Sequence, residues 1–216
     1  MEKKLLIFDL DGTLIDTLKD LNNAVNYSLS KHGYELRSLE HTRKSIGDGV
    51  AMLVKRSLPE NVTEIEYTDV LKDFEDYYKL HSNDNTSPYP GMKETLIKLK
   101  EKGYLLAVST NKIEDVAISL INNFYPNIFD TVCGDNKIRQ RKPSPDSINE
   151  ICKRLSFSDK NNIIYIGDTE VDFMTANNSK IGFILVSYGY RTEEEQITKK
   201  LTVLGIKKPE NLLKIL

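Results

Sequence analysis

The sequence has little of what several large classes of protein need. Only two of its 216 residues are cysteines and three are histidines. Cys133 and Cys152 are neither closely spaced nor matched with nearby histidines, which argues against a zinc site and favours two structural thiols. Basic residues are not in excess, because 30 lysines and arginines face 32 acidic residues and the net charge is -2. Binding to nucleic acid or to an anionic membrane is therefore not expected.

Long apolar runs are also missing. The run at residues 5–8 follows two lysines, but Asp9 ends it far short of a signal-peptide core or a membrane span. We therefore expect a cytoplasmic protein. The remaining composition, with 39% hydrophobic and 29% charged residues, is ordinary for a globular chain. The length fits one domain, or one domain that carries a smaller insert.

Apolar runs alternate with stretches of helical spacing over much of the chain. Four runs predict strands, at residues 5–10, 104–110, 162–168 and 182–188, and each is apolar over most of its length. Helical spacing follows at residues 112–123, 144–155 and 170–180. This alternation predicts an α/β fold, a Rossmann-like core with a mostly parallel sheet.

Residues 17–87 depart from this pattern. They show helical spacing at 18–33, 49–58 and 64–81 and no convincing strand. We therefore predict a core domain of residues 1–16 and 88–216, with a helical domain of residues 17–87 inserted after the first strand.

Three of the predicted strands end in polar residues, at the place where open α/β sheets bind their ligands. Those residues are Asp9 and Asp11 after the first strand, Ser109, Thr110 and Asn111 after the second, and Asp168 after the third, with Asp172 one helical turn further on. Carboxylates that converge at one edge of a sheet repel one another unless a cation lies among them. Mg²⁺ prefers such oxygen ligands, so the pattern indicates a magnesium site.

Four segments in this order resemble the motifs of the haloacid dehalogenase superfamily. They are "DLDGTLIDT", "VSTNK", "RKPSPD" and "GDTEVDFMTA". The segments "YPGMKETLIKLKEKGYLLAVSTNK", "GYRTEEE" and "KPENLLKIL" are similar to the phosphoglycolate-phosphatase-like branch, whose members carry a helical cap of type C1 after the first motif. The resemblance implies a Mg²⁺-dependent phosphatase that hydrolyses a small phosphomonoester through an aspartyl-phosphate.

The resemblance also implies roles for individual residues. Asp9 attacks phosphorus, and Asp11 protonates the leaving alkoxide and later deprotonates water. Thr110, Lys142 and the backbone near Gly12 stabilise the phosphoryl group, and Asn111 also binds the substrate. The implied metal ligands are the Asp9 carboxylate, the Asp11 carbonyl and Asp168, and Asp172 either holds waters around the metal or orients Lys142.

The cap is expected to select the substrate. Gly47 and Gly49 lie between two predicted helices, in a turn that could present N–H groups to the core. Arg43 and its basic neighbours Lys44, Lys55 and Arg56 could meet a second anionic group of the substrate, such as a carboxylate. Each of them could equally be a solvated charge on a helix face.

Simpler readings compete with several of these assignments. We expect Asp16 to cap the helix that begins near Leu18. Thr110 could instead cap a helix, and Ser109 could then take its place at the site. Lys142 could be a solvated lysine, and Asp172 could act only on the helix dipole.

Other functions also fit part of the pattern. A phosphomutase of the β-phosphoglucomutase type, a pyrophosphatase and a nucleotide 5'-phosphatase share the core motifs. A catalytically silent phosphate-binding relative is the non-enzyme alternative, but it is expected to lose Asp9, Asp11 or Lys142, and all three are present. The expected partner is a small phosphorylated metabolite, and the chain is expected to be a monomer or a homodimer.

Overall fold

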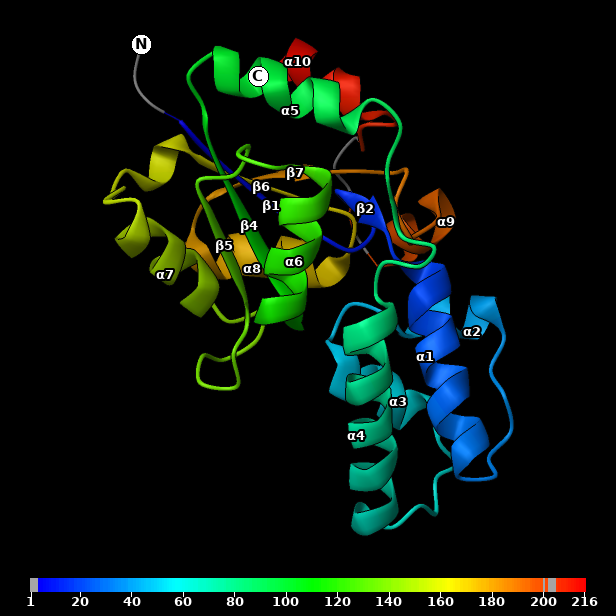
Figure 1. The fold of residues 1–216 in the computed structure, drawn as a ribbon. Helices are drawn as coiled ribbons and strands as arrows, with labels where there is room; N and C mark the ends of the chain where they lie inside the picture. The colour runs from blue at the N-terminus through cyan, green and yellow to red at the C-terminus, as the bar shows by residue number, and fades with distance from the viewer. Residues whose placement is uncertain (1–3, 200, 202–204) are drawn as a thin grey trace. The chain divides into compact units, whose positions relative to one another are not determined.

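The computed structural model describes residues 4–199, 201 and 205–216. The chain forms two compact units (Figure 1). Residues 1–16 and 88–216 make the larger one, here called the core unit, and residues 17–87 make the insert unit. No helix of the described residues combines the length and the apolar character that a membrane span requires.

A parallel sheet of five strands, in the order β5-β4-β1-β6-β7, forms the centre of the core unit. The strands are β1 (Leu5–Phe8), β4 (Leu105–Ile113), β5 (Thr131–Asp135), β6 (Ile163–Gly167) and β7 (Gly182–Leu185). In the register of the sheet, Leu5 lies between Leu105 and Ile163. Strand β1 is therefore paired on both edges, which places the residues that follow it at the middle of the sheet's carboxyl end.

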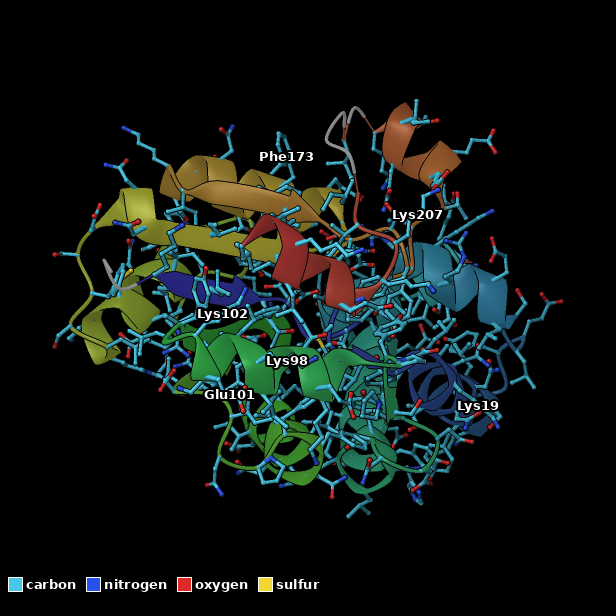
Figure 2. The ribbon with its side chains drawn as sticks, turned by 90° about the horizontal axis from the view of Figure 1, so that it is seen from above. Lys19, Lys98, Glu101, Lys102, Phe173 and Lys207 are labelled. Atoms are coloured by element: carbon cyan, nitrogen blue, oxygen red, sulfur yellow. The ribbon has the colours of Figure 1, made fainter. Side chains whose placement is uncertain are left out.

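Helices cover the sheet, as the predicted α/β fold requires. They are α5 (Met92–Glu101), α6 (Glu114–Phe124), α7 (Asp146–Arg154), α8 (Glu170–Ser179), α9 (Glu193–Thr198) and α10 (Leu212–Ile215), with short 3-10 turns at Lys160–Asn162 and Pro209–Asn211. Helix α5 shows why they form, since it buries Leu96 and Leu99 and exposes Lys98, Glu101 and the following Lys102 (Figure 2).

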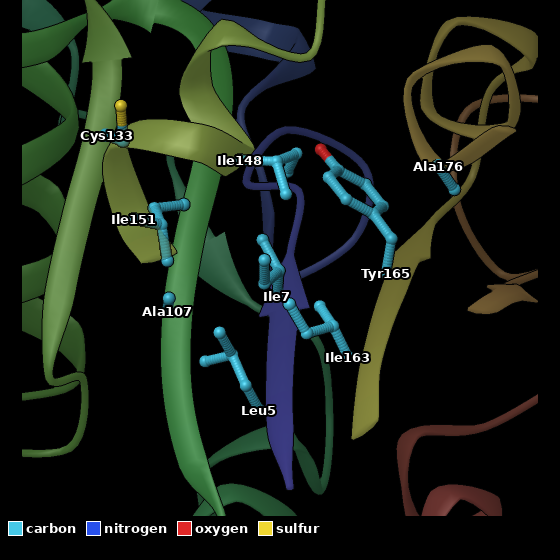
Figure 3. Close-up of a cluster of buried hydrophobic side chains, with 9 residues drawn as sticks. All are labelled: Leu5, Ile7, Ala107, Cys133, Ile148, Ile151, Ile163, Tyr165 and Ala176. Carbon is cyan, nitrogen blue, oxygen red and sulfur yellow. The ribbon is translucent and has the colours of Figure 1, made fainter. Parts of the chain in front are cut away.

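The two faces of the sheet are filled by alternate residues of each strand. Leu5 and Ile7 of β1 pack on one face, in a cluster to which α7 contributes Ile148 and Ile151 and α8 contributes Ala176 (Figure 3). Phe8 points to the other face, where its ring centroid lies 6.1 Å from that of Phe129. Because both faces are covered, the strands read as nearly continuous apolar runs.

The predicted strands are present, but one strand of the five-stranded sheet was not predicted. Strand β5 has only two large apolar side chains, Val132 and Cys133, and its other residues are polar or glycine. Its pairing with β4, with Val108 opposite Val132, places it in the sheet. Strand β4 also continues to Ile113, past the predicted start of a helix at Lys112.

Four helices make the insert unit: α1 (Leu18–Lys31), α2 (Leu39–Ser45), α3 (Val50–Ser57) and α4 (Glu64–His81). Its interior includes Val70, Phe74 and Tyr78, spaced four residues apart on α4 and fully buried. A buried carboxylate, Asp20 of α1, accepts hydrogen bonds from the backbone N–H groups of Asn85 and Thr86 at 2.8 to 3.0 Å. These hydrogen bonds connect the first and the last residues of the insert unit.

The prediction that Asp16 caps helix α1 is wrong by one residue. Thr17 occupies the N-cap position. Asp16 belongs to β2 (Ile15–Asp16), which pairs with β3 (Ser87–Pro88) in a separate two-stranded sheet. Its Oδ1 accepts a hydrogen bond from the hydroxyl of Tyr190 at 3.4 Å.

Candidate active site

Asp9 follows β1 directly and is almost fully buried, with 6% of its surface exposed. Its N–H donates to the carbonyl of Ile166 at 2.9 Å, which continues the pairing of β1 with β6. Its Oδ1 accepts a hydrogen bond from Nζ of Lys142 at 2.7 Å. Its Oδ2 accepts none from the described residues, so one oxygen of a rigidly held carboxylate stays available.

Asp168 lies beside Asp9 at the end of β6 and is fully buried. Its Oδ1 accepts from Oγ1 of Thr13 at 3.3 Å, and its Oδ2 accepts from the N–H of Tyr190 at 2.8 Å. Gly12 approaches it so closely that a Cβ at this position would lie 2.6 Å from Oδ2 of Asp168. The φ angle of Gly12, +85°, also belongs to the left-handed region that favours glycine.

Asp172 links the first turn of α8 to the site. Its Oδ2 accepts from the N–H and Oγ1 of Thr169 at 3.0 and 2.7 Å, in a capping box. Its Oδ1 accepts from Nζ of Lys142 at 2.7 Å. Asp172 therefore both caps its helix and contacts the buried lysine, so it does not act only on the helix dipole.

Lys142 is the cation of this cluster, and its side chain is only 3% exposed. Besides the two carboxylates, its Nζ donates to the hydroxyl of Tyr165 at 2.9 Å and to the carbonyl of Ser109 at 3.2 Å. The reading of Lys142 as a solvated lysine is wrong. Lys137, the other lysine of the same basic run, is exposed.

Asn111 holds Lys142 in place through the backbone. Its Oδ1 accepts from the N–H of Lys142 at 2.8 Å, and its Nδ2 donates to the carbonyl of Lys142 at 3.1 Å. Thr110 is buried beside it, and its Oγ1 accepts from the N–H of Lys112 at 3.2 Å. The hydroxyl of Ser109 bonds instead to that of Ser147 at 2.8 Å.

Three carboxylates converge here. One oxygen each of Asp9, Asp168 and Asp172 lies within 4.8 Å of the others. Burial and the neighbouring Asp172 raise the pKa of Asp9 to about 7, although Lys142 opposes the shift. Burial, together with the neighbouring Asp172 and Asp9, holds the pKa of Asp168 well above its usual range. In the absence of a cation this cluster thus favours protons, and its hard oxygen donors fit a divalent cation such as Mg²⁺.

The electrostatics of Lys142 complement those of the acids. Burial alone would lower the pKa of the lysine, but Asp172 and Asp9 outweigh it and raise that pKa well above the usual value. The ammonium group is therefore charged at neutral pH.

Two contacts of the site were not predicted. Nζ of Lys112 lies 2.8 and 3.1 Å from the two carboxylate oxygens of Asp11, and the hydroxyl of Tyr165 donates to the carbonyl of Ser109 at 2.7 Å. Tyr165 was assigned to a strand without a role for its hydroxyl. Its ring belongs to the buried hydrophobic cluster (Figure 3).

Known proteins share the sequence pattern of this chain. The sequence profile of the haloacid dehalogenase-like hydrolases matches residues 6–186. The chain belongs to the haloacid dehalogenase-like hydrolase family.

The relatives of this hydrolase indicate which kind of hydrolase it is. A phosphoglycolate phosphatase of Mesorhizobium japonicum is 32% identical over 196 residues, which are 88% of this chain and 85% of that protein. One of Aquifex aeolicus is 30% identical over 214 residues, or 99% and 96% of the two chains. The crystal structure of a predicted phosphoglycolate phosphatase from Haemophilus somnus superposes with a TM-score of 0.90 at 27% identity, covering 100% of this chain and 98% of that one. The family and these relatives together identify the hydrolase as a phosphatase, a phosphoric monoester hydrolase.

The residues predicted for the cap of this hydrolase lie in the insert unit. Arg43 donates to both carboxylate oxygens of Glu40, at 2.7 and 2.8 Å. Gly47 and Gly49, with φ angles of +128° and +86°, stand between α2 and α3 as expected. Arg56, one of the basic neighbours, pairs with the carboxylate of Asp48. These contacts lie within the unit, and the role of the cap residues stays a prediction.

Proposed function

We propose that this phosphatase hydrolyses a small phosphomonoester in a Mg²⁺-dependent reaction through an aspartyl-phosphate on Asp9, with phosphoglycolate as the first candidate substrate. One observation carries the proposal. Asp9 presents an oxygen without a hydrogen bond from the described residues, while its other oxygen is held by Lys142. The phosphoglycolate phosphatases of M. japonicum and A. aeolicus support the choice of substrate.

The first half of the reaction transfers the phosphoryl group to the protein. Oδ2 of Asp9 forms a bond to phosphorus as the bond from phosphorus to the leaving oxygen breaks. Asp11 gives its proton to that oxygen, so that an alcohol leaves rather than an alkoxide. Lys142 keeps Asp9 oriented, because its ammonium group contacts Asp9, Asp172 and Tyr165 at once.

The second half returns the protein to its starting state. Asp11 takes a proton from a water molecule, whose oxygen bonds to phosphorus as the bond between phosphorus and Asp9 breaks. The products are inorganic phosphate and free Asp9, and the proton that Asp11 lost is replaced. One group thus serves as acid and then as base.

The ligands that would hold Mg²⁺ are carboxylate oxygens of Asp9 and Asp168 with the backbone carbonyl of Asp11. When bound, the ion would offset the negative charge of the phosphoryl oxygens. Asp172 is suited to orient Lys142, because its Oδ1 accepts a hydrogen bond from Nζ of the lysine while its Oδ2 caps α8.

The remaining core residues bind the phosphoryl group. The hydroxyl of Thr110, the ammonium of Lys142 and N–H groups near Gly12 donate to its oxygens. Asn111 contributes by fixing the backbone of Lys142.

The insert unit acts as the cap that selects the substrate. Gly47 and Gly49 allow the turn that presents N–H groups, and Arg43 binds the second anionic group of the substrate. We further propose a cytoplasmic protein, monomeric or homodimeric, whose partner is a small phosphorylated metabolite. Two free cysteines are consistent with a reducing compartment.

The test is phosphate release from phosphoglycolate, hexose phosphates, nucleoside monophosphates, pyrophosphate and an aryl phosphate, with Mg²⁺ or with EDTA. We expect release only with Mg²⁺ and its loss in Asp9→Asn. Asp115→Asn is the matched control, because Asp115 is an exposed carboxylate of the same unit. Undiminished release by Asp9→Asn would contradict the mechanism, and preference for another ester would replace phosphoglycolate as the substrate.

A further inference from the structure

The end of β4 contacts both functional halves of the core site. Asn111 holds the backbone of Lys142, which contacts the nucleophile Asp9. The next residue, Lys112, reaches Asp11 across 101 positions of the sequence. Adjacent residues of one strand therefore hold the lysine that orients the nucleophile and the side chain that exchanges protons.

The contact between Lys112 and Asp11 is bidentate and approaches from the interior. Nζ of Lys112 lies 2.8 Å from Oδ1 and 3.1 Å from Oδ2 of Asp11. The lysine side chain is 1% exposed, whereas that of Asp11 is 15% exposed. A carboxylate has about four lone-pair positions, and a contact to both oxygens fixes its rotation while using only one position on each. The buried lysine thus fixes the partly exposed carboxyl group from behind.

We propose that Lys112 is a positioning residue that holds the carboxyl group of Asp11 in the orientation in which it exchanges a proton with the leaving group. This inference rests on the proposed function, because it gives Lys112 its role through the acid–base role of Asp11. In this role Lys112 acts through Asp11 rather than on the substrate. A misplacement of about 1 Å in a catalytic group is enough to cost on the order of 10²-fold in rate.

The proposal predicts a dependence on the leaving group. An alkoxide that leaves phosphoglycolate needs the proton of Asp11, whereas a nitrophenolate leaves without one. The ratio kcat/KM reports only the steps up to the departure of the leaving group, so hydrolysis of the aspartyl-phosphate does not obscure the comparison. Lys112→Met is expected to lower kcat/KM by about 10²-fold for phosphoglycolate and by less than about fivefold for nitrophenyl phosphate.

A matched control comes from the same unit. Lys100 makes the same kind of bidentate contact, with Nζ 2.8 and 2.9 Å from the two oxygens of Asp130. Lys100→Met is expected to change kcat/KM by less than about twofold for either ester, because a pair at the surface contributes little. Lys112→Arg, which keeps the charge, is expected to recover part of the lost activity on phosphoglycolate.

Two further measurements separate positioning from a general loss of structure. Competitive inhibition by inorganic phosphate should stay within about twofold of wild type in Lys112→Met, because Thr110 and Lys142 are intact. Lys112→Met combined with Asp11→Asn should be no slower on phosphoglycolate than Asp11→Asn alone, because the two residues act as one unit.

Equal losses on both esters, or no loss on either, would overturn the inference. If Lys112→Met does not fold, Lys112→Gln provides the same comparison with a smaller change. Wild-type protein that hydrolyses neither ester would instead overturn the proposed function.

Discussion

Charged side chains are arranged differently in the core unit and in the insert unit. In the core, Lys142 and Lys112 are 3% and 1% exposed and contact Asp9 and Asp11, each more than 100 positions away in the sequence. In the insert, Arg43 and Lys44 contact Glu40, which lies only three and four positions away on the same helix. These two core pairs depend on the fold as a whole, whereas the contacts of Glu40 lie within one short helix.

In the proposed function, this difference separates catalysis in the core unit from substrate selection in the insert unit. A buried pair is costly to break, because the remaining charge has no water to replace its partner. An exposed pair is cheap to break, because water and salt replace the partner. The core can therefore keep one fixed arrangement for phosphoryl transfer, while charges on the insert can change with little effect on folding.

The replacement of Lys142 should have the largest effect. Lys142→Met leaves Asp9 and Asp172 without their shared cation, so we expect a loss of at least about 10³-fold in kcat. The free energy of unfolding should fall by about 3 kcal/mol. Lys137→Met is the control, because Lys137 belongs to the same basic run but is exposed. Steady-state kinetics and urea unfolding check both values, and activity within about tenfold of wild type would contradict the assignment of Lys142.

Glycine substitutions test how tightly the core is packed. Gly12→Ala introduces a Cβ 2.6 Å from Asp168 at a φ of +85°, whereas Gly103→Ala has nearly the same φ, +87°, and no atom within 4 Å. Gly103→Ala should cost about 1–2 kcal/mol from backbone strain alone. Gly12→Ala should in addition lower activity by about 10²-fold and raise the Mg²⁺ concentration needed for half-maximal rate. Equal effects of the two substitutions would mean that Asp168 tolerates displacement.

Asp20 differs from Glu40 in the insert, because its side chain is buried, as the carboxylates of the core site are. Asp20→Ala leaves the N–H groups of Asn85 and Thr86 without their acceptor, so we expect a loss of about 2–4 kcal/mol. Asp69→Ala, at an exposed carboxylate of α4, should change stability by less than about 0.5 kcal/mol. Hydrogen exchange of the insert amides and thermal unfolding measure the effect, and equal stability of the two variants would show that the ends of the insert are held by other contacts.

The pH dependence of Mg²⁺ binding tests the carboxylates of the core site. The pKa of Asp9 is raised to about 7 in the folded protein without a cation, so the folded state holds a proton there that the unfolded state releases at lower pH. This contribution to stability is present at low pH and is lost as the pH rises through about 7. Mg²⁺ must displace that proton, so its stabilising effect should be larger at pH 8 than at pH 5. Melting temperatures with Mg²⁺ and with EDTA test this, and Asp9→Asn should reduce the difference between the two pH values.

The sequence predicted the core site better than the contacts that hold it. Asp9, Asp168 and Asp172 could be placed together because parallel strands end at one edge of a sheet. Strand β5 escaped prediction because its place depends on pairing with β4 rather than on its own apolar pattern. The partners of Lys112 and Tyr165 were missed for the same reason, since each contact joins distant parts of the chain.

The smallest effects are expected for the pair of Glu40 and Arg43 in the insert, which the proposed function assigns to substrate selection. Glu40→Gln should leave the melting temperature within about 1 °C, because the Glu40 side chain is largely exposed. Arg43→Met should have a similarly small effect, because the methionine chain can keep most of the packing of an arginine side chain that is only 15% exposed. Arg43 pairs with Glu40 through two hydrogen bonds, which hold the pKa of the Glu40 carboxyl near 2. If Arg43 binds the second anionic group of the substrate, Arg43→Met should raise KM for phosphoglycolate by about fivefold, and Glu40→Gln, which removes a competing carboxylate, should lower it slightly. Nitrophenyl phosphate lacks that group, so its KM should not change in either variant. Opposite shifts in KM at constant stability would assign Arg43 to substrate selection, whereas unchanged KM values in both variants would make it a solvated charge of a helix face.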